Sequence, residues 1–430
     1  MVSTQVRRVR RVMGAFAAGL KRIGLGQVDD PRLQDQVKRP LASVLAVVLL
    51  ALATRQHSLK DMERQSTLLS RKMRKALKVF GRVPDTTVRT LMMRLDHDSL
   101  RGLLFRQVRS AHRSKQLEPQ VLPFGMCAID GKYSATKKPQ GPYAQDLKGA
   151  HELRTMTVSL ISAAAPVVLD AMPVPAKTNE MGIFPKVLET LRREYGRSAL
   201  FRLISADAGM TSRENARLVV AHGWDYLFAL KDGQPTLRSE AERLIGPRLS
   251  LPAMAKTEDV TDNQTSELRE IWVSKEIAGY HEWAHLRTVI RVRHTTLKNG
   301  MPVKPGEDRY FLSSLGMEEL SPAMLLHGVR AHWRIENEVH GALDIFYDED
   351  KQPWIYATPG QLSINILRRV MLNITLLHRH GRRKRESTKM VPWKTLIATL
   401  TAGLHGATSQ HLDGLRWPNL PPARVPCRPG

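Results

Sequence analysis

The sequence predicts an α/β fold that is preceded by a helical region and interrupted by a β-rich insertion. Three observations lead to this prediction. Between residues 121 and 234, short apolar runs typical of strands are followed by helical patterns, which indicates an α/β core. Residues 31–115 carry helix signals alone, and residues 235–305 carry strand signals without the alternation.

The charge balance indicates a polyanionic partner. The chain has 430 residues, with 66 Lys and Arg against 41 Asp and Glu, so the formal net charge is 66 − 41 = +25. A surplus of this size opposes compact folding through self-repulsion and is typical of proteins that bind nucleic acid. A basic soluble enzyme is the alternative that charge alone leaves open.

Cysteine content and the lengths of the apolar runs exclude other classes. The two cysteines, Cys127 and Cys427, are too few for a disulfide scaffold or a cysteine-rich zinc finger, and they fit a reducing compartment. The most apolar run, residues 41–53, is shorter than the roughly 20 residues that a bilayer span needs. We therefore expect a buried helix there and no membrane partner.

The first 115 residues divide into two predicted parts. Residues 1–30 form a basic N-terminal arm, either a helix on a phosphate backbone or a solvated terminus, because cations recur between its apolar residues. Residues 31–115 form a small all-helical domain. Pro40 opens an apolar helix, Ser58 caps the next one and Pro84 begins another.

The α/β core is expected in two parts, residues 121–234 and 306–378, separated by the β-rich insertion at 235–305. In the first part we expect strands at 121–129, 156–162, 167–174, 200–205 and 226–230, and helices at 179–195 and 211–222. In the second part we expect a strand at 310–315, a long helix from Ser321 and a helix at 361–378. Residues 379–430 form a basic C-terminal tail.

Three acidic residues occupy positions suited to chemistry. Asp130 and Asp207 each follow a short apolar strand, where open α/β sheets place ligand-binding residues, and Glu336 lies on the long helix. Two Mg²⁺ ions about 3.5–4 Å apart would need such carboxylates to activate water or a 3′-hydroxyl and to stabilise the leaving oxygen. The alternative is structural, because an Asp-Gly pair after a strand is often a turn and Glu336 can be an ordinary surface acid.

The motifs around these acids resemble the DDE transposases of bacterial insertion sequences, in particular the ISAs-type, H-repeat-associated group. The resemblance covers nearly the whole chain, and its most specific part is the His-Trp-x-Ile-Glu-Asn core at residues 332–337. The other matching blocks are Ala128-Ile129-Asp130-Gly131-Lys132, Ala176-Lys177-Thr178-Asn179-Glu180, Ser205-Ala206-Asp207-Ala208 and the segments 225–231 and 309–315.

The resemblance implies a ribonuclease-H-like catalytic core with the β-rich insertion placed before the helix of the catalytic glutamate. It assigns Asp130, Asp207 and Glu336 as catalytic residues and metal ligands for two Mg²⁺ ions, which Mn²⁺ can replace. It implies cleavage and strand transfer at the inverted repeats of an insertion sequence, by a homodimer on double-stranded DNA that includes transposon ends and target. No small-molecule cofactor is expected, and the expected location is the bacterial cytoplasm, at the nucleoid.

Two alternatives to this activity stay open. One is a catalytically inactive, transposase-derived DNA-binding protein, and the other is a metal-dependent DNA nuclease without strand transfer. The broader group has Tyr, Arg and Lys around its glutamate where this chain has Val329, His332 and Leu343. The intact acidic trio favours the enzyme.

A set of polar residues near the motifs is predicted to contact DNA: Lys132, Lys177, Asn179, Lys231, Arg330, His332, Arg334 and His340. Residues 332, 336, 340 and 344 recur at intervals of four, which keeps them on one face of an α-helix. The structural alternatives are a polar helix face with hydrogen-bonded histidines, an N-cap at Asn179, and solvated strand ends at the lysines.

Overall fold

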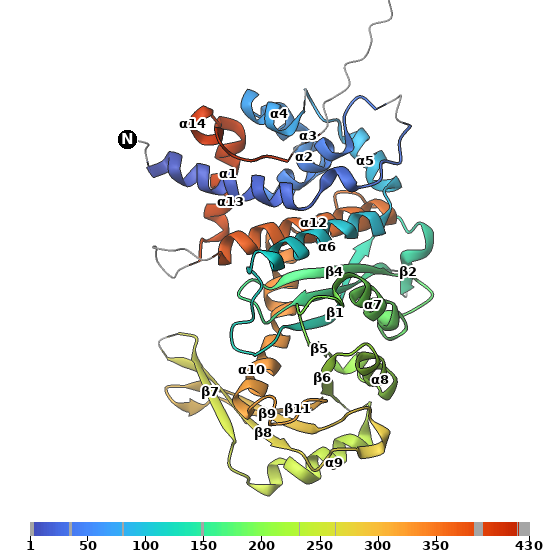
Figure 1. Ribbon diagram of the computed structural model, residues 1–430, viewed down its shortest axis with the longest axis vertical. Helices are drawn as coiled ribbons and strands as arrows, with labels where there is room; N and C mark the ends of the chain where they lie inside the picture. The colour runs from blue at the N-terminus through green and yellow to red at the C-terminus, as the bar shows by residue number, and fades with distance from the viewer. Residues whose placement is uncertain are drawn as a thin grey trace, which may run out of the picture.

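The molecule has a helical end and a sheet end, with two helices between them. The computed structural model describes residues 4–420 except 34–36, 80, 148–149, 232, 263, 382–389 and 419. In Figure 1, α12 (Thr358–His380) and α6 (His97–Arg113) cross the molecule between the sheet and the remaining helices from the two ends of the chain, and both contact β4 (Val167–Val174). None of the helices in these ranges is both long and apolar enough to cross a bilayer.

One large mixed sheet forms the other end. Within the described residues it has eleven strands in the order β2-β3-β1-β5-β6-β11-β9-β8-β7, with β4 paired to β3 and β10 paired to β9. The predicted α/β class is therefore confirmed as a mixed α/β fold. The remaining strands are β1 (Met126–Thr136), β2 (Ala144–Leu147), β3 (Ala150–Leu160), β5 (Leu203–Ala206), β6 (Asp225–Leu230), β7 (Ala255–Val260), β8 (Thr265–Ser274), β9 (Thr288–Lys298), β10 (Met301–Pro302) and β11 (Glu307–Ser313).

Strand β1 is longer than its apolar run predicts. We expected it to stop at Asp130, but it continues to Thr136. Its parallel pairing with β5 ends at Ile129, opposite Ala206, whereas its antiparallel pairing with β3 continues through Asp130. The second half of β1 lacks one neighbour, and beyond Gly131 its residues alternate between buried and exposed, so the apolar signal ends before the strand does.

The expected hairpin and crossover helices are present. β3 and β4 pair antiparallel, and β1, β5 and β6 are parallel neighbours. The predicted helices correspond to α7 (Glu180–Tyr195), between β4 and β5, and α8 (Arg213–Ala221), between β5 and β6. These connections bring the carboxyl ends of β1, β5 and β6 to one edge of the sheet.

The β-rich insertion extends the core sheet instead of forming a sheet of its own. The expected strands at 269–273 and 288–293 lie within β8 and β9, and β9 pairs with the core strand β11. The insertion also contains a helix that the sequence analysis did not predict, α9 (Pro235–Ile245).

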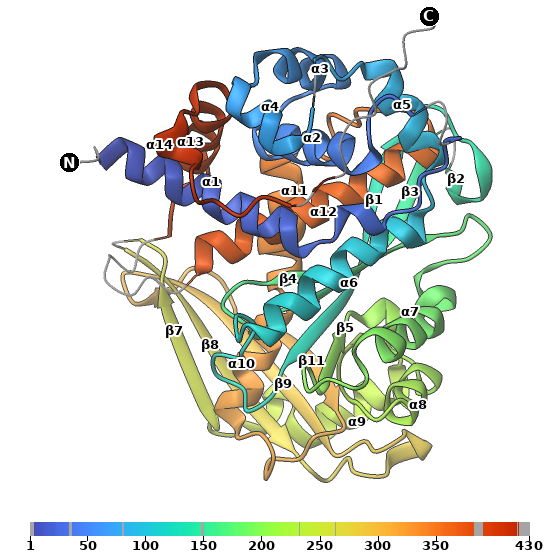
Figure 2. The same cartoon turned by 45° about the horizontal axis from the view of Figure 1, so that its top comes forward.

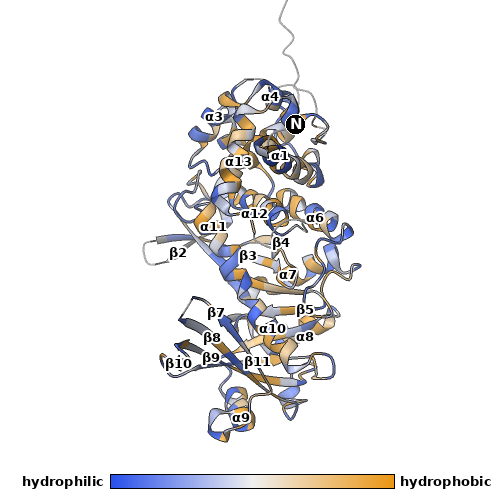
Figure 3. Ribbon diagram, turned by 90° about the vertical axis from the view of Figure 1, so that its left-hand side faces the viewer, coloured by the Kyte–Doolittle hydropathy of each residue, from blue (hydrophilic) through white to orange (hydrophobic). Residues whose placement is uncertain are grey.

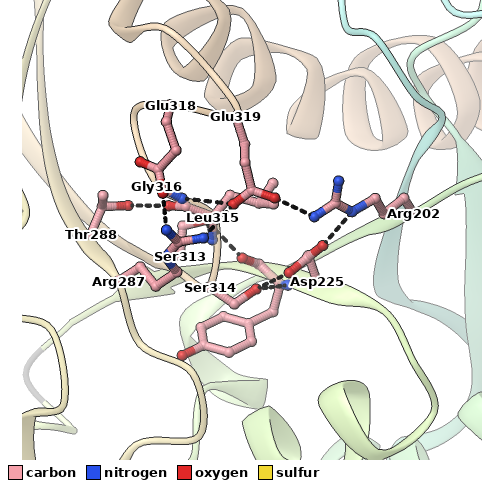
Figure 4. A network of polar contacts seen from close by, with 11 residues as sticks. Arg202, Asp225, Arg287, Thr288, Ser313, Ser314, Leu315, Gly316, Glu318 and Glu319 are labelled. Carbon is pink, nitrogen blue, oxygen red and sulfur yellow. Dashed lines mark hydrogen bonds and ion pairs between the residues drawn. The ribbon is translucent and has the colours of Figure 1, made fainter.

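An ion-pair network fastens the insertion to the core where β5 and β6 begin. Arg202, just before β5, donates hydrogen bonds to Asp225 and to Glu319. Arg287, just before β9, donates to the same Glu319 carboxylate at 2.6 Å. Figure 4 shows Glu319 between the two guanidinium groups. The strands on both sides of the junction are therefore held in one register.

The helices expected in residues 31–115 are present, and their core is continuous with that of the sheet. They are α2 (Leu41–Ala53), α3 (Leu59–Leu68), α4 (Arg71–Leu77), α5 (Asp85–Arg94) and α6. One hydrophobic cluster extends from them through α12 into the strands. Arg101 of α6 donates two buried hydrogen bonds to Asp170 of β4, at 2.8 and 2.6 Å. The boundary of a separate helical domain at residue 115 stays a prediction.

The N-terminal segment is a packed helix rather than a free arm. α1 (Thr4–Arg22) contacts α12 and two helices of the predicted C-terminal tail, α13 (Trp393–Gly406) and α14 (Ser409–Leu412). Gly19 of α1 lies against Ile374 of α12, where an added Cβ would be 2.7 Å from the Ile374 side chain. Figure 2 shows α1 beside α13 and α14, and in Figure 3 apolar residues gather where α1, α12 and α13 lie together.

The apolar residues between the arginines of α1 recur at helical spacing, which explains this packing. One face of the helix is buried, and Arg7, Arg8 and Arg11 lie exposed on the other. The residues of the predicted tail between 382 and 389 lie outside the described residues.

Candidate active site

Two of the three predicted acids lie side by side at one edge of the sheet. Ile129 and Ala206 are register partners in the parallel strands β1 and β5, so Asp130 and Asp207 are the next residues on neighbouring strands. Ala206 is in turn paired with Phe228 of β6, which ends two residues later, before Lys231. The sequence-based expectation that these side chains meet at the carboxyl ends of the strands agrees with this register.

Glu336 reaches the same edge from the helix that follows the insertion. α10 (Pro322–His332) begins at its N-cap Ser321, as expected, and is followed by a π-helical segment, η7 (Ile335–His340), and by α11 (Gly341–Phe346). Segment η7 contacts β1, and Glu336 is exposed on it. The residues at this spacing of four nevertheless face the same two strands. His332 contacts Ser205 beside β1, and His340 and Asp344 contact Asp130 and Lys132 of β1.

The charges of these acids act on one another. Burial, together with the negative charges of Glu336, Asp207 and Glu180, raises the pKa of Asp130 to about 7. Burial and Asp207 also raise the pKa of Glu336, while Arg309 and Lys231 lower it. Four carboxylates and two cations therefore share one electrostatic environment at this edge of the sheet.

The donor atoms suit a divalent cation, although they do not form a finished coordination sphere. Across the described residues, no three His, Cys, Asp or Glu side chains converge closely enough to hold a metal ion. However, Asp207 Oδ1 and Glu180 Oε1 are buried and have no hydrogen-bond partner. Buried carboxylate oxygens that repel one another and lack donors are the ligands that Mg²⁺ prefers. The donor chemistry therefore fits the expected cations.

His332 is buried behind the site. Its Nδ1 is 3.0 Å from the Ser205 hydroxyl of β5, two residues before Asp207. Burial lowers the pKa of His332 to about 4, so the ring is neutral at pH 7. Only 4% of the residue is exposed. This arrangement suits a residue that positions β5 against α10, and the predicted DNA contact stays a prediction.

His340 touches a catalytic candidate directly. Its Nδ1 lies 3.4 Å from Asp130 Oδ2, and its Nε2 is buried and has no hydrogen-bond partner. Burial, with the positive charges of Arg369 and Lys132, lowers the pKa of His340 to about 3. A neutral imidazole at this place can support the Asp130 carboxyl from behind, which differs from the phosphate contact that the sequence suggested.

Three predicted DNA contacts have partners within the protein. Lys132 is buried, with Nζ 2.7 Å from Asp344 Oδ1 and 3.5 Å from Asp350 Oδ1. Arg330 forms an ion pair with Asp259 of β7. Arg334 donates to Glu338 and to carbonyl groups of residues 161, 163 and 164. In this structure these cations hold the fold together, so a DNA contact would require them to exchange partners.

The other predicted contacts are exposed. Asn179 is the N-cap of α7, and its side chain accepts a hydrogen bond of 2.9 Å from the Gly182 amide, as the structural alternative proposed. Lys177 precedes it and is exposed. Lys231 lines a cavity of about 310 Å³ together with Asp207 and Arg309. Lys177 and Lys231 are therefore the cations of the predicted set that are placed to meet an external anion.

Two residues of this site were not among the predicted site residues, although Glu180 belongs to the motif block at 176–180. Arg309 lies in β11 directly before Tyr310, which pairs with Leu230 of β6, so it lies at the same edge as Lys231. Its guanidinium stacks 4.6 Å from the Trp333 ring centroid. Glu180 is the first residue of α7 and lies against Gly131. A charged residue directly before the apolar run at 310–312 was the available signal for Arg309. Both residues belong to motif blocks that the sequence analysis quoted without giving them a function.

Comparison with protein families gives one match that covers more than half of the chain. The family model for the transposase DDE domain matches residues 125–355. This range begins just before β1 and ends after α11, so it contains Asp130, Asp207, Glu336 and the β-rich insertion.

Curated relatives are similar at low identity. "Putative transposase YncI" of Escherichia coli O157:H7 is 23% identical over 331 residues, which cover 75% of this chain and 79% of that protein. "H repeat-associated putative transposase YhhI" of Escherichia coli K12 is 25% identical over 201 residues, which cover 45% of this chain and 51% of YhhI. The match thus spans about half the length of YhhI.

Among solved structures, the chain is similar to a piggyBac transposase synaptic complex with hairpin DNA, solved by cryo-electron microscopy. The TM-score is 0.42 at 13% sequence identity, and the alignment covers 88% of this chain and 73% of that chain.

Proposed function

Because the chain belongs to the transposase DDE domain family, we propose that it cleaves DNA at the inverted repeats of an insertion sequence and transfers the strand ends to target DNA. The catalytic residues in this proposal are Asp130, Asp207 and Glu336. A homodimer would carry out the reaction on bacterial nucleoid DNA, because two transposon ends have to be joined to one target.

One observation carries the proposal. Asp130 and Asp207 directly follow register partners in adjacent parallel strands, and Glu336 is close enough that its charge raises the pKa of Asp130. Carboxylates that are placed where they repel one another, in a protein with a large positive surplus, are typical of a functional site. A bound divalent cation would offset this repulsion. The unpartnered oxygen of Asp207 supports the same reading.

The strand order supports a ribonuclease-H-like core. Three antiparallel strands, β4, β3 and β1, are followed across the sheet by the parallel strands β5 and β6. The β-rich insertion then separates β6 from the helix that leads to Glu336. This order supports the core that the resemblance implied.

In this proposal the residues of the site have different roles. Asp130, Asp207 and Glu336 would hold Mg²⁺, which supplies an activated nucleophile and stabilisation of the leaving oxygen in phosphodiester cleavage. Lys231 and Arg309 line the cavity beside Asp207 and would bind the phosphate next to the scissile bond. His340 would keep Asp130 in place, and Lys177 would meet the DNA backbone outside the site.

The decisive experiment is cleavage of DNA that carries the native ends of the element. Purified wild type and Asp207→Ala would be incubated with that DNA and Mg²⁺, and nicked and joined products would be separated on a denaturing gel. We expect cleavage and strand transfer from wild type, and neither product from Asp207→Ala.

Each other result selects an alternative. Equal cleavage by both proteins would refute the proposed catalytic site. Cleavage by wild type without joining would leave a metal-dependent nuclease. Specific binding to the ends without cleavage would leave a DNA-binding protein that is catalytically inactive.

A further inference from the structure

We propose that Glu180 is a fourth carboxylate of this site and binds the same divalent cation as Asp130 in the free protein. The inference extends the proposed function, because it names a further ligand for the metal ions that the reaction would use. It depends on the contact between α7 and β1, which brings a residue 50 positions further along the chain to the side of Asp130 (180 − 130).

The first argument is a close approach that only glycine allows. Gly131 follows Asp130 in β1, and a Cβ added there would be 1.7 Å from Glu180 Oε1 and 2.4 Å from Glu180 Cδ. The Glu180 carboxylate therefore occupies the space above the Gly131 backbone. Any side chain at residue 131 would push it away from Asp130.

The second argument is how firmly Glu180 is held. It is the first residue of α7, and the Asn179 cap fixes the start of that helix. The Tyr133 hydroxyl, two residues further along β1 than Gly131, forms a hydrogen bond with the Glu180 side chain. A capped helix on one side and a hydroxyl on the other leave the carboxylate little freedom to turn towards solvent.

The third argument is that one oxygen of the Glu180 carboxylate has no hydrogen-bond partner. Glu180 Oε1 is buried and accepts no hydrogen bond, although its negative charge acts on Asp130. An unpaired, buried carboxylate oxygen beside a second carboxylate is costly unless a cation lies between them. Mg²⁺ and Mn²⁺ are bound by oxygen ligands of this kind.

A purely structural role for Glu180 makes different predictions. If Glu180 only accepts the hydrogen bond from Tyr133, neutral Gln at this position would weaken the fold without affecting cation binding. If it binds the cation, the neutral variant would weaken binding, and the apo protein would become more stable because one source of repulsion is gone.

The test is Mn²⁺ binding to the full chain without DNA, measured by isothermal titration calorimetry, with thermal unfolding of each apo variant as a check of folding. The variants are Glu180→Gln and Gly131→Ala, since the second moves the carboxylate without changing a charge. The matched control is Glu189→Gln, which removes an exposed carboxylate from the same helix.

We expect Mn²⁺ affinity to fall about 10-fold or more in both Glu180→Gln and Gly131→Ala, and to be unchanged in Glu189→Gln. Wild-type affinity in Glu180→Gln, or no Mn²⁺ binding by the folded wild type, would overturn the inference. The proposed function is judged separately by DNA cleavage. Binding that needs Glu180 in a wild type that does not cut would support the inference and reject the proposed function.

Discussion

His340 and Asp130 form a contact between the catalytic helix and the first strand of the sheet, with Nδ1 3.4 Å from Oδ2. The contact comes from two elements that are far apart in the sequence, β1 and the π-helical segment before α11. Because the ring is buried and neutral, it can orient the carboxyl without competing for its charge.

Replacing His340 should therefore harm chemistry more than binding. We expect His340→Phe to reduce single-turnover cleavage about 10–100-fold, as removal of an outer partner of a metal ligand does, with little change in the Kd for end DNA. Gel-based cleavage and fluorescence anisotropy on the same DNA measure the two effects. A loss of DNA affinity as large as the loss of cleavage would instead support the phosphate contact predicted from the sequence.

Asp130 should make the metal-free protein less stable at high pH. Its pKa is about 7 in the folded state and 3.8 in the unfolded state, so the folded state binds the proton more tightly between these values. The loss of unfolding free energy that results from ionising Asp130 is absent below about pH 4, grows as the pH rises and reaches its full size above about pH 7. Asp130→Asn should remove it.

We expect Asp130→Asn, without divalent cations, to be more stable than wild type at pH 8 by on the order of 4 kcal/mol, and about equal at pH 4. Denaturant unfolding at the two pH values, with EDTA present, measures this difference. A variant that is less stable than wild type at pH 8 would show that the Asp130 carboxylate is already compensated in the free protein.

His332 should make the protein sensitive to acid. Its pKa is about 4 in the folded state and 6.5 in the unfolded state, so the unfolded state takes up the proton first as the pH falls. Stability is therefore lost between about pH 6.5 and 4, by on the order of 3 kcal/mol, because the shift is about 2.5 units. His332→Gln should not show this loss.

The measurement is the acid-unfolding curve of His332→Gln, followed by circular dichroism, with His112→Gln at the end of α6 as the control. The first variant should unfold at a lower pH than wild type, and the second at the same pH. Matching curves for wild type and both variants would contradict the assignment of His332 as a buried neutral residue.

The contact of α1 with α12 can be tested at Gly19, where the two helices approach each other closely. A Cβ at Gly19 would be 2.7 Å from the Ile374 side chain, whereas Gly26 has no neighbouring atom within 4 Å of that position. Gly19→Val should cost about 1–3 kcal/mol in unfolding free energy, because the branched Ile374 side chain has little room to move. Gly26→Ala should be close to neutral, and equal effects of the two changes would argue against the packing of α1.

The sequence predicted most of the core elements because their signals are local. The apolar runs that precede Asp130 and Asp207 predicted strands that lead into these acids, and the structure pairs the two strands in parallel, with Ile129 opposite Ala206. The sequence analysis grouped Glu336 with the two aspartates by its acidity and its place on the long helix, and the resemblance then assigned it as a metal ligand. No local pattern says where a helix after a long insertion returns to the sheet.

What the sequence did not predict depends on distant partners. The π-helical segment after α10 lies against β1, and Lys132 is paired with Asp344 and Asp350, more than 200 residues away. Glu180 next to Gly131 follows from the docking of α7 on β1. Periodicity describes which face of an element is apolar, but it does not identify the element that covers it.

Because α1 packs against α13, part of its apolar face is buried only after α13 has been synthesised. The first helix leaves the ribosome 393 − 22 = 371 residues before its partner begins. At about 5–20 residues per second, its apolar face waits roughly 20–70 s for that partner. During this interval the nascent chain presents an uncovered apolar surface to chaperones and to other chains. A product cut short before α13 would lack this partner of α1, although α1 would still contact α12 and α6.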